Sequence, residues 1–305
     1  MQIFGEKRDV MAKYRFIYNY KNNDIYRNSF NSLAKLVFGL DFQKWWDYNC
    51  WNDDYICYSY MDGEQIIANA SIHKMTIVSF DKEYQAIQIG TVMTHPDYRK
   101  KGLAKKLIEH IIAIYEKQSD FIYLFANKTV LDFYPKFGFE QVEESSFTMN
   151  ITDWKKTEKW DRLRKLDPGN FIDFQIMKKL ASARIPVSTI LGVKNSEHLL
   201  LFYFLLAFQN GIYYSDKEDA IILYEQTNGQ LHVYDIISTK KVEMEPLLNT
   251  IITDETKTIH FHFAADYENV NIQSELQKEK ENMLFVRPLG KNEWGQFLFP
   301  LTSHG

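Results

Sequence analysis

Two periodicities of hydrophobic residues alternate along the first 150 residues. Strand-like apolar segments occur at Tyr14–Tyr20, Tyr55–Met61 and Ile66–Phe80, and Asp62-Gly63 between the last two predicts a hairpin turn. Between the first and second of these strands, Ser29–Gly39 carries apolar residues at helical spacing. The pattern therefore predicts a strand, a helix and a long hairpin.

Ile87–Ala104 contains the most informative change of pattern. An apolar run with strand character stops at Pro96, crosses a basic loop with one glycine, and enters a helix. The apolar positions of that helix recur mostly at i, i+3 and i+4 spacing: Leu103, Leu107, Ile108, Ile111, Ile112 and Ile114. The first N–H groups of a helix lack helical partners, and the helix dipole places partial positive charge there. The segment is therefore a candidate binding site for a phosphate-bearing ligand.

Gly102 lies in that loop. A residue without a Cβ tolerates positive φ and lets the backbone approach an anion closely. Several charge-assisted hydrogen bonds of roughly 1.5–3 kcal/mol each would then hold a pyrophosphate.

A second strand–turn unit follows. Phe121–Ala126 is rich in aromatic and β-branched residues and ends at Asn127. We expect a helix from Thr129 to Phe137, closed by Gly138 as its C-cap. Gly138–Ile151 would then supply a closing pair of strands.

These segments resemble the GCN5-related N-acetyltransferases (GNAT). The pyrophosphate loop of that family, Arg/Gln-x-x-Gly-x-Gly/Ala, is matched by Arg99, Gly102 and Ala104. The approach to the loop also fits, through Val92, His95, Pro96 and Tyr98. Asp132–Phe139 resembles the family's second motif, in which an aromatic-Tyr pair precedes a Gly-Phe turn. The resemblance covers about the first 150 residues.

The resemblance implies acetyl-CoA as cosubstrate. The implied contacts to it come from Val92, Met93, Thr94, Arg99, Lys100, Lys101, Gly102, Leu103, Ala104 and Asn127. Asn127 corresponds to the residue that hydrogen-bonds the pantetheine arm, and Tyr134 to the general acid that protonates the leaving thiolate. A backbone N–H on the strand of Val92 and Met93 would stabilise the oxyanion. Tyr134 has the structural alternative of an amphipathic residue at the edge of the core.

The general base stays open. The strand offers Gln88, Thr91 and Thr94 but no carboxylate, with Glu83 just upstream and His95 just downstream. His95 before proline is typical of a structural corner. Deprotonation of the amine through ordered water is an equal alternative.

An aromatic and acidic stretch precedes the hairpin and corresponds to one wall of the family's acceptor cleft. It holds Phe42, Trp45, Trp46, Asp47, Tyr48, Trp51, Asp53, Asp54 and Tyr55. Aromatic faces and carboxylates suit a cationic amine. The alternative is that the tryptophans belong to the core and the aspartates to turns.

The second half repeats the order of elements. After a charged linker, Thr152–Asn170, we expect helices at Phe171–Ala183 and Glu197–Phe208. Strands are expected at Gly211–Ser215, Ala220–Gln226, Gln230–Ile237, Thr258–Ala264 and Met283–Arg287, with a helix at Met244–Ile252. This order indicates an internal duplication, with a different α+β domain as the alternative.

The second copy lacks the phosphate loop. Ser238–Glu243 stands where Arg99–Ala104 would recur, without a glycine and with Glu243 at the anion position. The predicted fold class is therefore α+β with a mixed sheet. It comprises a catalytic GNAT fold at residues 1–151, a linker at 152–170, and a second, degenerate GNAT-like domain without a coenzyme A site at 171–305. That domain would close the acceptor cleft or form a subunit interface.

Composition narrows the partners. The net charge of −4 does not favour nucleic acid or anionic membranes, and the longest apolar run, Leu199–Phe208, is too short to cross a bilayer. Met1–Lys21 has no signal-peptide pattern, and two cysteines, Cys50 and Cys57, fit a cytoplasmic location. No metal site is expected, because His260 and His262 share a strand face without a third ligand.

Two function classes follow. The first is an acetyl-CoA-dependent N-acetyltransferase acting on a primary amine of a small molecule or a protein, as a monomer or homodimer. The alternative is a non-catalytic acyl-CoA-binding sensor or scaffold module. The intact Tyr134 and Asn127 favour the enzyme, whereas the absence of a carboxylate on the central strand favours the alternative.

Overall fold

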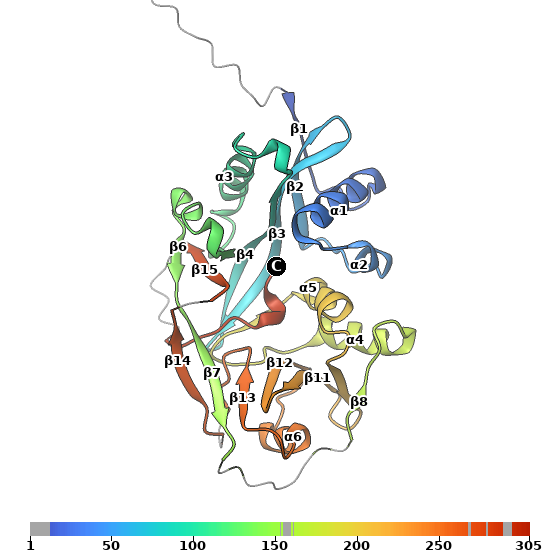
Figure 1. Cartoon of the computed structure of the whole chain (residues 1–305), viewed down its shortest axis with the longest axis vertical. Coiled ribbons are helices and arrows are strands. Elements are labelled where there is room, and N and C mark those ends of the chain that lie inside the picture. The colour runs from blue at the N-terminus through green and yellow to red at the C-terminus, as the bar shows by residue number, and fades with distance from the viewer. Residues whose placement is uncertain are drawn as a thin grey trace, which may run out of the picture.

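Two mixed β-sheets form the frame of the molecule (Figure 1). The computed structural model describes residues 13–152, 154, 160, 162–267, 270–278, 280–288 and 295–305. The start of Met1–Lys21 and most of the middle of the predicted linker lie outside these residues. The final residue, Gly305, lies where the two sheets meet (Figure 1).

The first sheet has the strand order β1-β2-β3-β4-β5-β15-β6, and β9 pairs with β3 beside this path. Its strands are β1 (Arg15–Tyr18), β2 (Tyr55–Asp62), β3 (Gln65–Ser79), β4 (Lys82–Thr94), β5 (Phe121–Asn127), β6 (Glu140–Val142), β9 (Gly192–Lys194) and β15 (Asn282–Arg287). Only the β4–β5 pair is parallel. The predicted first strand and hairpin are confirmed.

The second sheet has the order β14-β7-β13-β12-β11-β10-β8. Its strands are β7 (Glu144–Asn150), β8 (Arg164–Lys165), β10 (Ile212–Ser215), β11 (Ala220–Thr227), β12 (Gln230–Ser238), β13 (Thr258–Phe261) and β14 (Gln273–Gln277). Here only β12 and β13 run parallel.

One strand of the first half lies in the second sheet, and two strands of the second half, β9 and β15, lie in the first. β7, from the first half, lies between β13 and β14, and β15, from the end of the second half, lies between β5 and β6. The prediction that Gly138–Ile151 closes the first sheet as a strand pair is therefore wrong, because only β6 stays there. The placement of Met283–Arg287 in the second unit is wrong for the same reason. A division at residue 151 does not separate the sheets.

Both sheets nevertheless follow one plan. Reading the second sheet from β8 to β14 gives the same sequence of strand roles as reading the first from β1 to β6. Each parallel pair is short, and each strand before it carries a bulge with one extra residue, at Thr91–Val92 in β4 and at Tyr234 in β12. The predicted tandem of similar folds is confirmed at this level.

Helices cover both faces of the first sheet. α1 (Asp24–Phe38) and α2 (Gln43–Asp47) lie on one face and α3 (Leu103–Tyr115) on the other (Figure 1). α4 (Phe171–Ala183), α5 (Glu197–Phe202), the π-helical turn η5 (Tyr203–Ala207) and α6 (Met244–Ile251) belong to the second half. One apolar core joins α1 and α2 to α4 and α5, so the halves share an interior.

Local chemistry sets the helix ends. Asn23 accepts a hydrogen bond from the Tyr26 N–H at 3.1 Å and starts α1 earlier than the apolar pattern predicted. The predicted helix Thr129–Phe137 is wrong: the segment forms two 3-10 turns, η3 (Lys128–Val130) and η4 (Tyr134–Phe137). Pro135 has no N–H to donate to a helix, which explains the break. Gly138 closes η4 at φ 77°, as expected of a C-cap.

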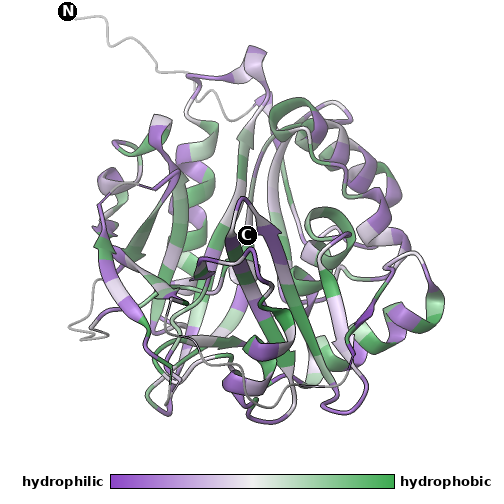
Figure 2. Cartoon of the chain, turned by 60° about the horizontal axis from the view of Figure 1, so that its bottom comes forward, coloured by the Kyte–Doolittle hydropathy of each residue, from purple (hydrophilic) through white to green (hydrophobic). Residues whose placement is uncertain are grey.

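β15 is buried on both faces. Met283 and Phe285 pack with the α3 side, whereas Leu284 and Val286 pack with the opposite side. Such a strand requires a neighbour on each edge and a layer on each face. Figure 2 shows the same distribution across the chain, with apolar residues on the sheets and inward helix faces and polar residues outside.

We predict that Phe285→Ala lowers the free energy of unfolding by about 3–5 kcal/mol, because it leaves a cavity between β15 and η4. Phe285 is 1% exposed. The matched control is Leu276→Ala on β14, where the side chain is 56% exposed. Denaturant titration measures both variants. Equal, small losses would contradict the central position of β15.

Candidate active site

A basic groove lies where β4 gives way to α3. Its wall is formed mainly by Thr94, Tyr98, Arg99, Lys100, Gly102, Leu103, Ala104, Lys105, Phe133 and Lys136, around a cavity of about 430 Å³. The first helical hydrogen bond of α3 runs from the Lys106 N–H to the Gly102 carbonyl, so the preceding N–H groups are free of helical partners. Cations and helix N–H groups together suit a pyrophosphate.

Gly102 is required by backbone conformation rather than by space. Its φ is 78°, and a Cβ added there would meet nothing within 4 Å. Lys100 also has positive φ, at 62°, so the loop makes two left-handed turns before the helix. The open side of the loop is where the predicted anion would lie.

A cleft opens between β4 and β5. The two strands pair only from Ala86 to Gln88, and among the described residues no strand pairs with the remaining β5-facing edge of β4. Thr91 lies in this unpaired part with φ 48°, and its carbonyl accepts from the Asn69 side chain at 2.9 Å. The bulge at Thr91–Val92 thus lies on the unpaired edge of β4, with the Thr91 carbonyl bonded on the β3 side.

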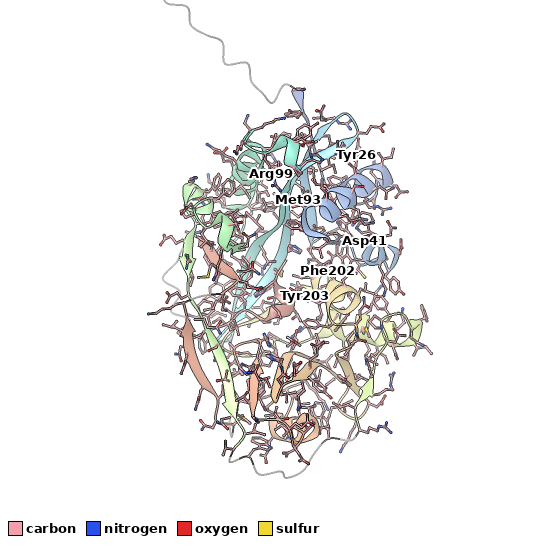
Figure 3. The ribbon with its side chains drawn as sticks, in the orientation of Figure 1. Tyr26, Asp41, Met93, Arg99, Phe202 and Tyr203 are labelled. Carbon is pink, nitrogen blue, oxygen red and sulfur yellow. The ribbon has the colours of Figure 1, made fainter. Side chains whose placement is uncertain are left out.

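Other predicted site residues are placed less directly. The Met93 side chain points into the core on the α1 side, away from α3, so only its main chain is available (Figure 3). The Lys101 ammonium lies 4.3 Å from the centre of the Tyr98 ring. The Asn127 side-chain Oδ1 accepts from the N–H and hydroxyl groups of Thr129, so Asn127 caps η3.

Tyr134 begins η4 and is buried against aromatic rings of Phe133, Phe139 and Phe285. Burial raises the pKa of its hydroxyl to about 12. The side chain therefore stays protonated at neutral pH, as a proton donor requires.

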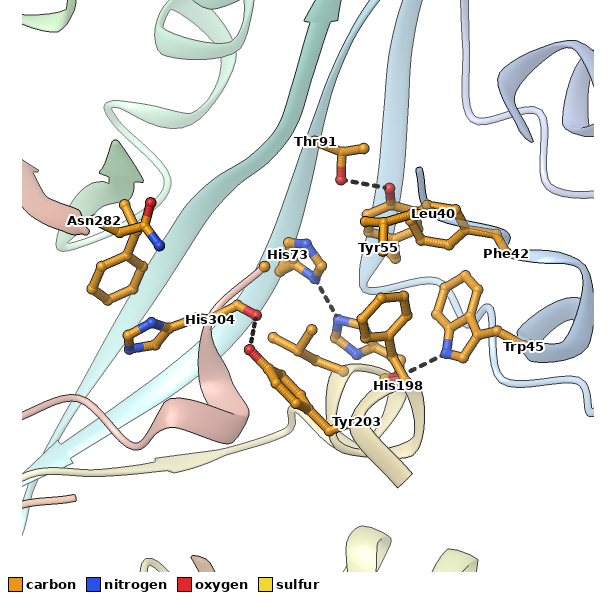
Figure 4. Close-up of a pocket in the computed structure, with 14 residues that line it drawn as sticks. Leu40, Phe42, Trp45, Tyr55, His73, Thr91, His198, Tyr203, Asn282 and His304 are labelled. Carbon is orange, nitrogen blue, oxygen red and sulfur yellow. Dashed lines mark hydrogen bonds between the residues drawn. The ribbon is translucent and has the colours of Figure 1, made fainter. Parts of the chain in front are cut away.

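A second pocket lies between the halves, beside Thr91 (Figure 4). Its volume is about 290 Å³ and its lining residues are Leu40, Phe42, Trp45, Tyr55, His73, Thr91, Phe125, His198, Leu199, Phe202, Tyr203, Asn282, His304 and Gly305. We call it the junction pocket. Phe202 and Tyr203 reach it from the second half, below the first sheet (Figure 3).

Two histidines that sequence reasoning missed face each other in the junction pocket. His73 on β3 and His198 on α5 are 4% and 1% exposed, and their Nδ1 and Nε2 atoms are 3.0 Å apart (Figure 4). Burial lowers the pKa of His73 well below its ordinary value and that of His198 to about 3. Both rings are therefore neutral at pH 7. They lie 125 residues apart, so no local sequence motif contains both of them.

The candidate bases from the sequence have other partners. Glu83 is an exposed residue that forms an ion pair with Lys194 at 2.6 Å. His95 accepts from the Asp97 N–H at 3.3 Å and caps the short turn η2 (Pro96–Tyr98). The aromatic stretch divides as its structural alternative predicted: Trp45, Trp46 and Trp51 are buried in the core, although Trp45 also lines the junction pocket.

Residues 299–305 are held in the junction pocket by hydrogen bonds from both halves. The Gln88 amide donates to the Ser303 carbonyl, and the Tyr203 hydroxyl donates to the His304 carbonyl, each at 2.9 Å. The His304 ring stacks on Phe125 with centroids 3.6 Å apart. A Cβ on Gly90 would lie 2.8 Å from the Gly305 carbonyl carbon, so glycine on β4 permits this approach.

The corresponding edge of β12 is hydrogen-bonded to a segment of its own chain, beside a pocket of about 290 Å³. Arg184 and Asp235 form a buried, two-pronged ion pair at 2.6 and 2.7 Å. The Ile185 N–H donates to the Ser238 carbonyl at 2.9 Å, beside the end of β12. Glu243 lies directly before the first turn of α6, where the sequence predicted a negative charge in place of a bound anion.

Three comparisons with known proteins agree with this geometry. Residues 21–142 match the model of an acetyltransferase (GNAT) domain. The chain carries a GNAT domain. N-alpha-acetyltransferase 50 of Danio rerio is 35% identical over 71 residues, which span 22% of this chain and 42% of that protein. The chain thus covers less than half of this curated relative. Residues 21–142 are thus similar to the acetyltransferase domains of this family.

Solved structures extend the likeness to the second half. A conserved Enterococcus faecalis protein, described as a probable N-acyltransferase, has a TM-score of 0.60 and 16% identity over 90% of this chain and 72% of its own. A GCN5-related N-acetyltransferase from Kribbella flavida has a TM-score of 0.54 and 15% identity over 90% and 71%. Because the sequence identity is only 15–16%, these two structures show a similar fold and nothing more.

The described residues contain no candidate for a metal site or for a membrane-spanning helix. No group of three or more His, Cys, Asp or Glu side chains is arranged to hold a metal ion in the described part of the chain. No helix in that part is both long and apolar enough to span a membrane.

We predict that acid weakens the fold through the His73–His198 pair. Because folding lowers both pKa values from 6.5, the unfolded chain binds protons that the folded chain does not. The histidines therefore do not reduce the free energy of unfolding above about pH 6.5. Below that pH the free energy of unfolding decreases, by about 2 kcal/mol per buried histidine at pH 5. Urea titrations at pH 7.5 and 5 measure the loss of unfolding free energy between these two pH values.

His198→Gln should reduce this loss by about 2 kcal/mol, whereas His110→Gln, at an exposed position, should leave the loss unchanged. The same pH sensitivity in His198→Gln and wild type would contradict the assignment.

Proposed function

We propose that the chain is an N-acetyltransferase that moves an acetyl group from acetyl-CoA to a primary amine. The observation that carries the proposal is the open basic groove at α3 joined to the unpaired edge of β4. The pyrophosphate of the donor would lie against Arg99, Lys100 and the first N–H groups of α3. Its pantetheine arm would then follow the cleft between β4 and β5, toward Thr91.

The reaction needs three groups at the inner end of this cleft. A main-chain N–H of Val92 or Met93 would stabilise the oxyanion that forms on the thioester carbonyl. The amine nitrogen attacks that carbon, the C–S bond breaks, and Tyr134 donates a proton to the thiolate sulphur. Its raised pKa keeps the hydroxyl protonated until then. The amine gives up its proton to water, because no described carboxylate side chain faces the cleft.

The second half would supply one wall of the acceptor site rather than a second donor site. In this half the Arg184–Ser188 segment is hydrogen-bonded to the end of β12, and Glu243 would repel an anion at α6. Phe202 and Tyr203 line the junction pocket from this half. The cytoplasmic location expected from the cysteines stays a prediction.

We expect Gly102→Glu to abolish binding of acetyl-CoA, because it strains a left-handed backbone and brings a carboxylate to the pyrophosphate. The matched control is Gly63→Glu in the β2–β3 hairpin. Gly63 also has positive φ, 59°, with nothing within 4 Å of its Cβ position. Calorimetric titration compares the two. Loss of binding in both variants, or in neither, would contradict the assigned groove.

We expect Tyr134→Phe to lower turnover by roughly 10²–10⁴ with little change in acetyl-CoA affinity, because only the proton transfer is lost. Release of the free thiol of coenzyme A measures the rate. Tyr84→Phe, at a partly exposed tyrosine on β4, serves as control. An unchanged rate in Tyr134→Phe would exclude it as the acid. Tight binding of acetyl-CoA without transfer to any amine would favour the alternative of a non-catalytic acyl-CoA module.

A further inference from the structure

The junction pocket has a predominantly aromatic and aliphatic wall. Leu40, Phe42 and Trp45 contribute it from the first half, and Leu199 and Phe202 from the second. Phe125 adds a further ring from β5. This wall extends to the surface, since Leu40 is 37% exposed. An apolar body could therefore enter past Leu40 and pack along the rings.

Hydroxyl and imidazole groups gather at the inner end of the junction pocket, and Tyr203, Asn282 and His304 add further polar groups to its lining. The Thr91 and Tyr55 hydroxyls are 3.1 Å apart there, and the His73–His198 pair lies beside them (Figure 4). Thr91 belongs to the bulge of β4 that would meet the thioester. A single nitrogen at this end would thus lie next to the donor, while the rest of the molecule contacts rings.

No ionised side chain lines this pocket among the described residues. Two acids that neighbour lining residues in sequence have partners elsewhere: Asp41 accepts from Lys35 and Asn31 at 2.8 Å each, and Glu197 accepts from Asn52 at 3.0 Å. The histidines of the lining are neutral at pH 7, because burial lowers the pKa of His304 to about 3 as it does for His198. An amine with several positive charges would lose hydration here, and no ionised side chain of the wall would compensate for that loss.

We propose that the acceptor is a small monoamine with an aromatic or branched apolar body, and that the wall of the junction pocket selects against polyamines. The inference rests on the proposed function. One ammonium group is accommodated by the faces of Trp45 and Tyr55 and by hydrogen bonds at the inner end. The ammonium first loses one proton to water, and the neutral amine then forms the C–N bond. As the C–S bond breaks, the nitrogen loses its second proton to water, the thiolate sulphur takes a proton from Tyr134, and water reprotonates Tyr134.

The test compares phenethylamine with spermidine at saturating acetyl-CoA, with release of the coenzyme A thiol as readout. We expect kcat/KM for phenethylamine to exceed that for spermidine by about 100-fold. A carboxylate added to the wall should narrow this preference, so Leu40→Asp and Phe202→Asp should each lower it about 10-fold. The control is Leu36→Asp, on the same helix–loop segment but outside the pocket and 55% exposed, which should keep the wild-type ratio.

Each other outcome overturns the proposal in a distinct way. Preferred transfer to spermidine, or to the N-terminus of a short peptide, would overturn the acceptor class and leave the acetyltransferase function standing. The same ratio in all three variants would show that the junction pocket does not bind the acceptor. Binding of acetyl-CoA without transfer to any of the amines would overturn the proposed function and the acceptor class together.

Discussion

The exchange of β7 and β15 is the constraint on which the rest of the structure depends. Each sheet has a position between its fifth strand and its last that the same half of the chain leaves empty. A strand of the other half fills each position. Phe285 of the second half is therefore buried in a core of the first half, and Phe147 of the first half in a core of the second. Along the described strands the chain crosses between the sheets four times, because β9 also returns to the first sheet, and neither sheet is complete without the other half.

The last of these crossings, from β14 to β15, brings the end of the chain to the candidate active site. After β15 leaves the first sheet, the chain returns and runs through residues 297–305 into the junction pocket. Glu144, which starts β7, accepts from the Phe299 N–H at 2.9 Å, and Asp235 on β12 accepts from the Thr302 hydroxyl. The same Asp235 forms the buried ion pair with Arg184. One carboxylate thus bonds both to Arg184 beside β12 and to the tail that enters the junction pocket.

The sequence predicted local structure better than it predicted pairing. α4 was expected at Phe171–Ala183 and found there, because an apolar stripe and the Asn170 cap are local features. The apolar run of β15 indicated a strand, but nothing in Met283–Arg287 specifies which sheet accepts it. Arg99, Gly102 and Ala104 were found together because one loop carries them. His73 and His198 were missed because a contact between distant segments leaves no local pattern, and the expected helix at Thr129–Phe137 failed at Pro135.

In our proposal, the two sheets share one strand order but only the first binds acetyl-CoA. At the matching edge of the second sheet, Arg184–Ser188 bonds to β12. Amide hydrogen exchange with and without acetyl-CoA tests this proposal directly, since each bound segment reports separately. The account predicts added protection at Thr91–Ala104 and none at Ile236–Val242. Equal protection in both segments would contradict it, as would protection confined to the second.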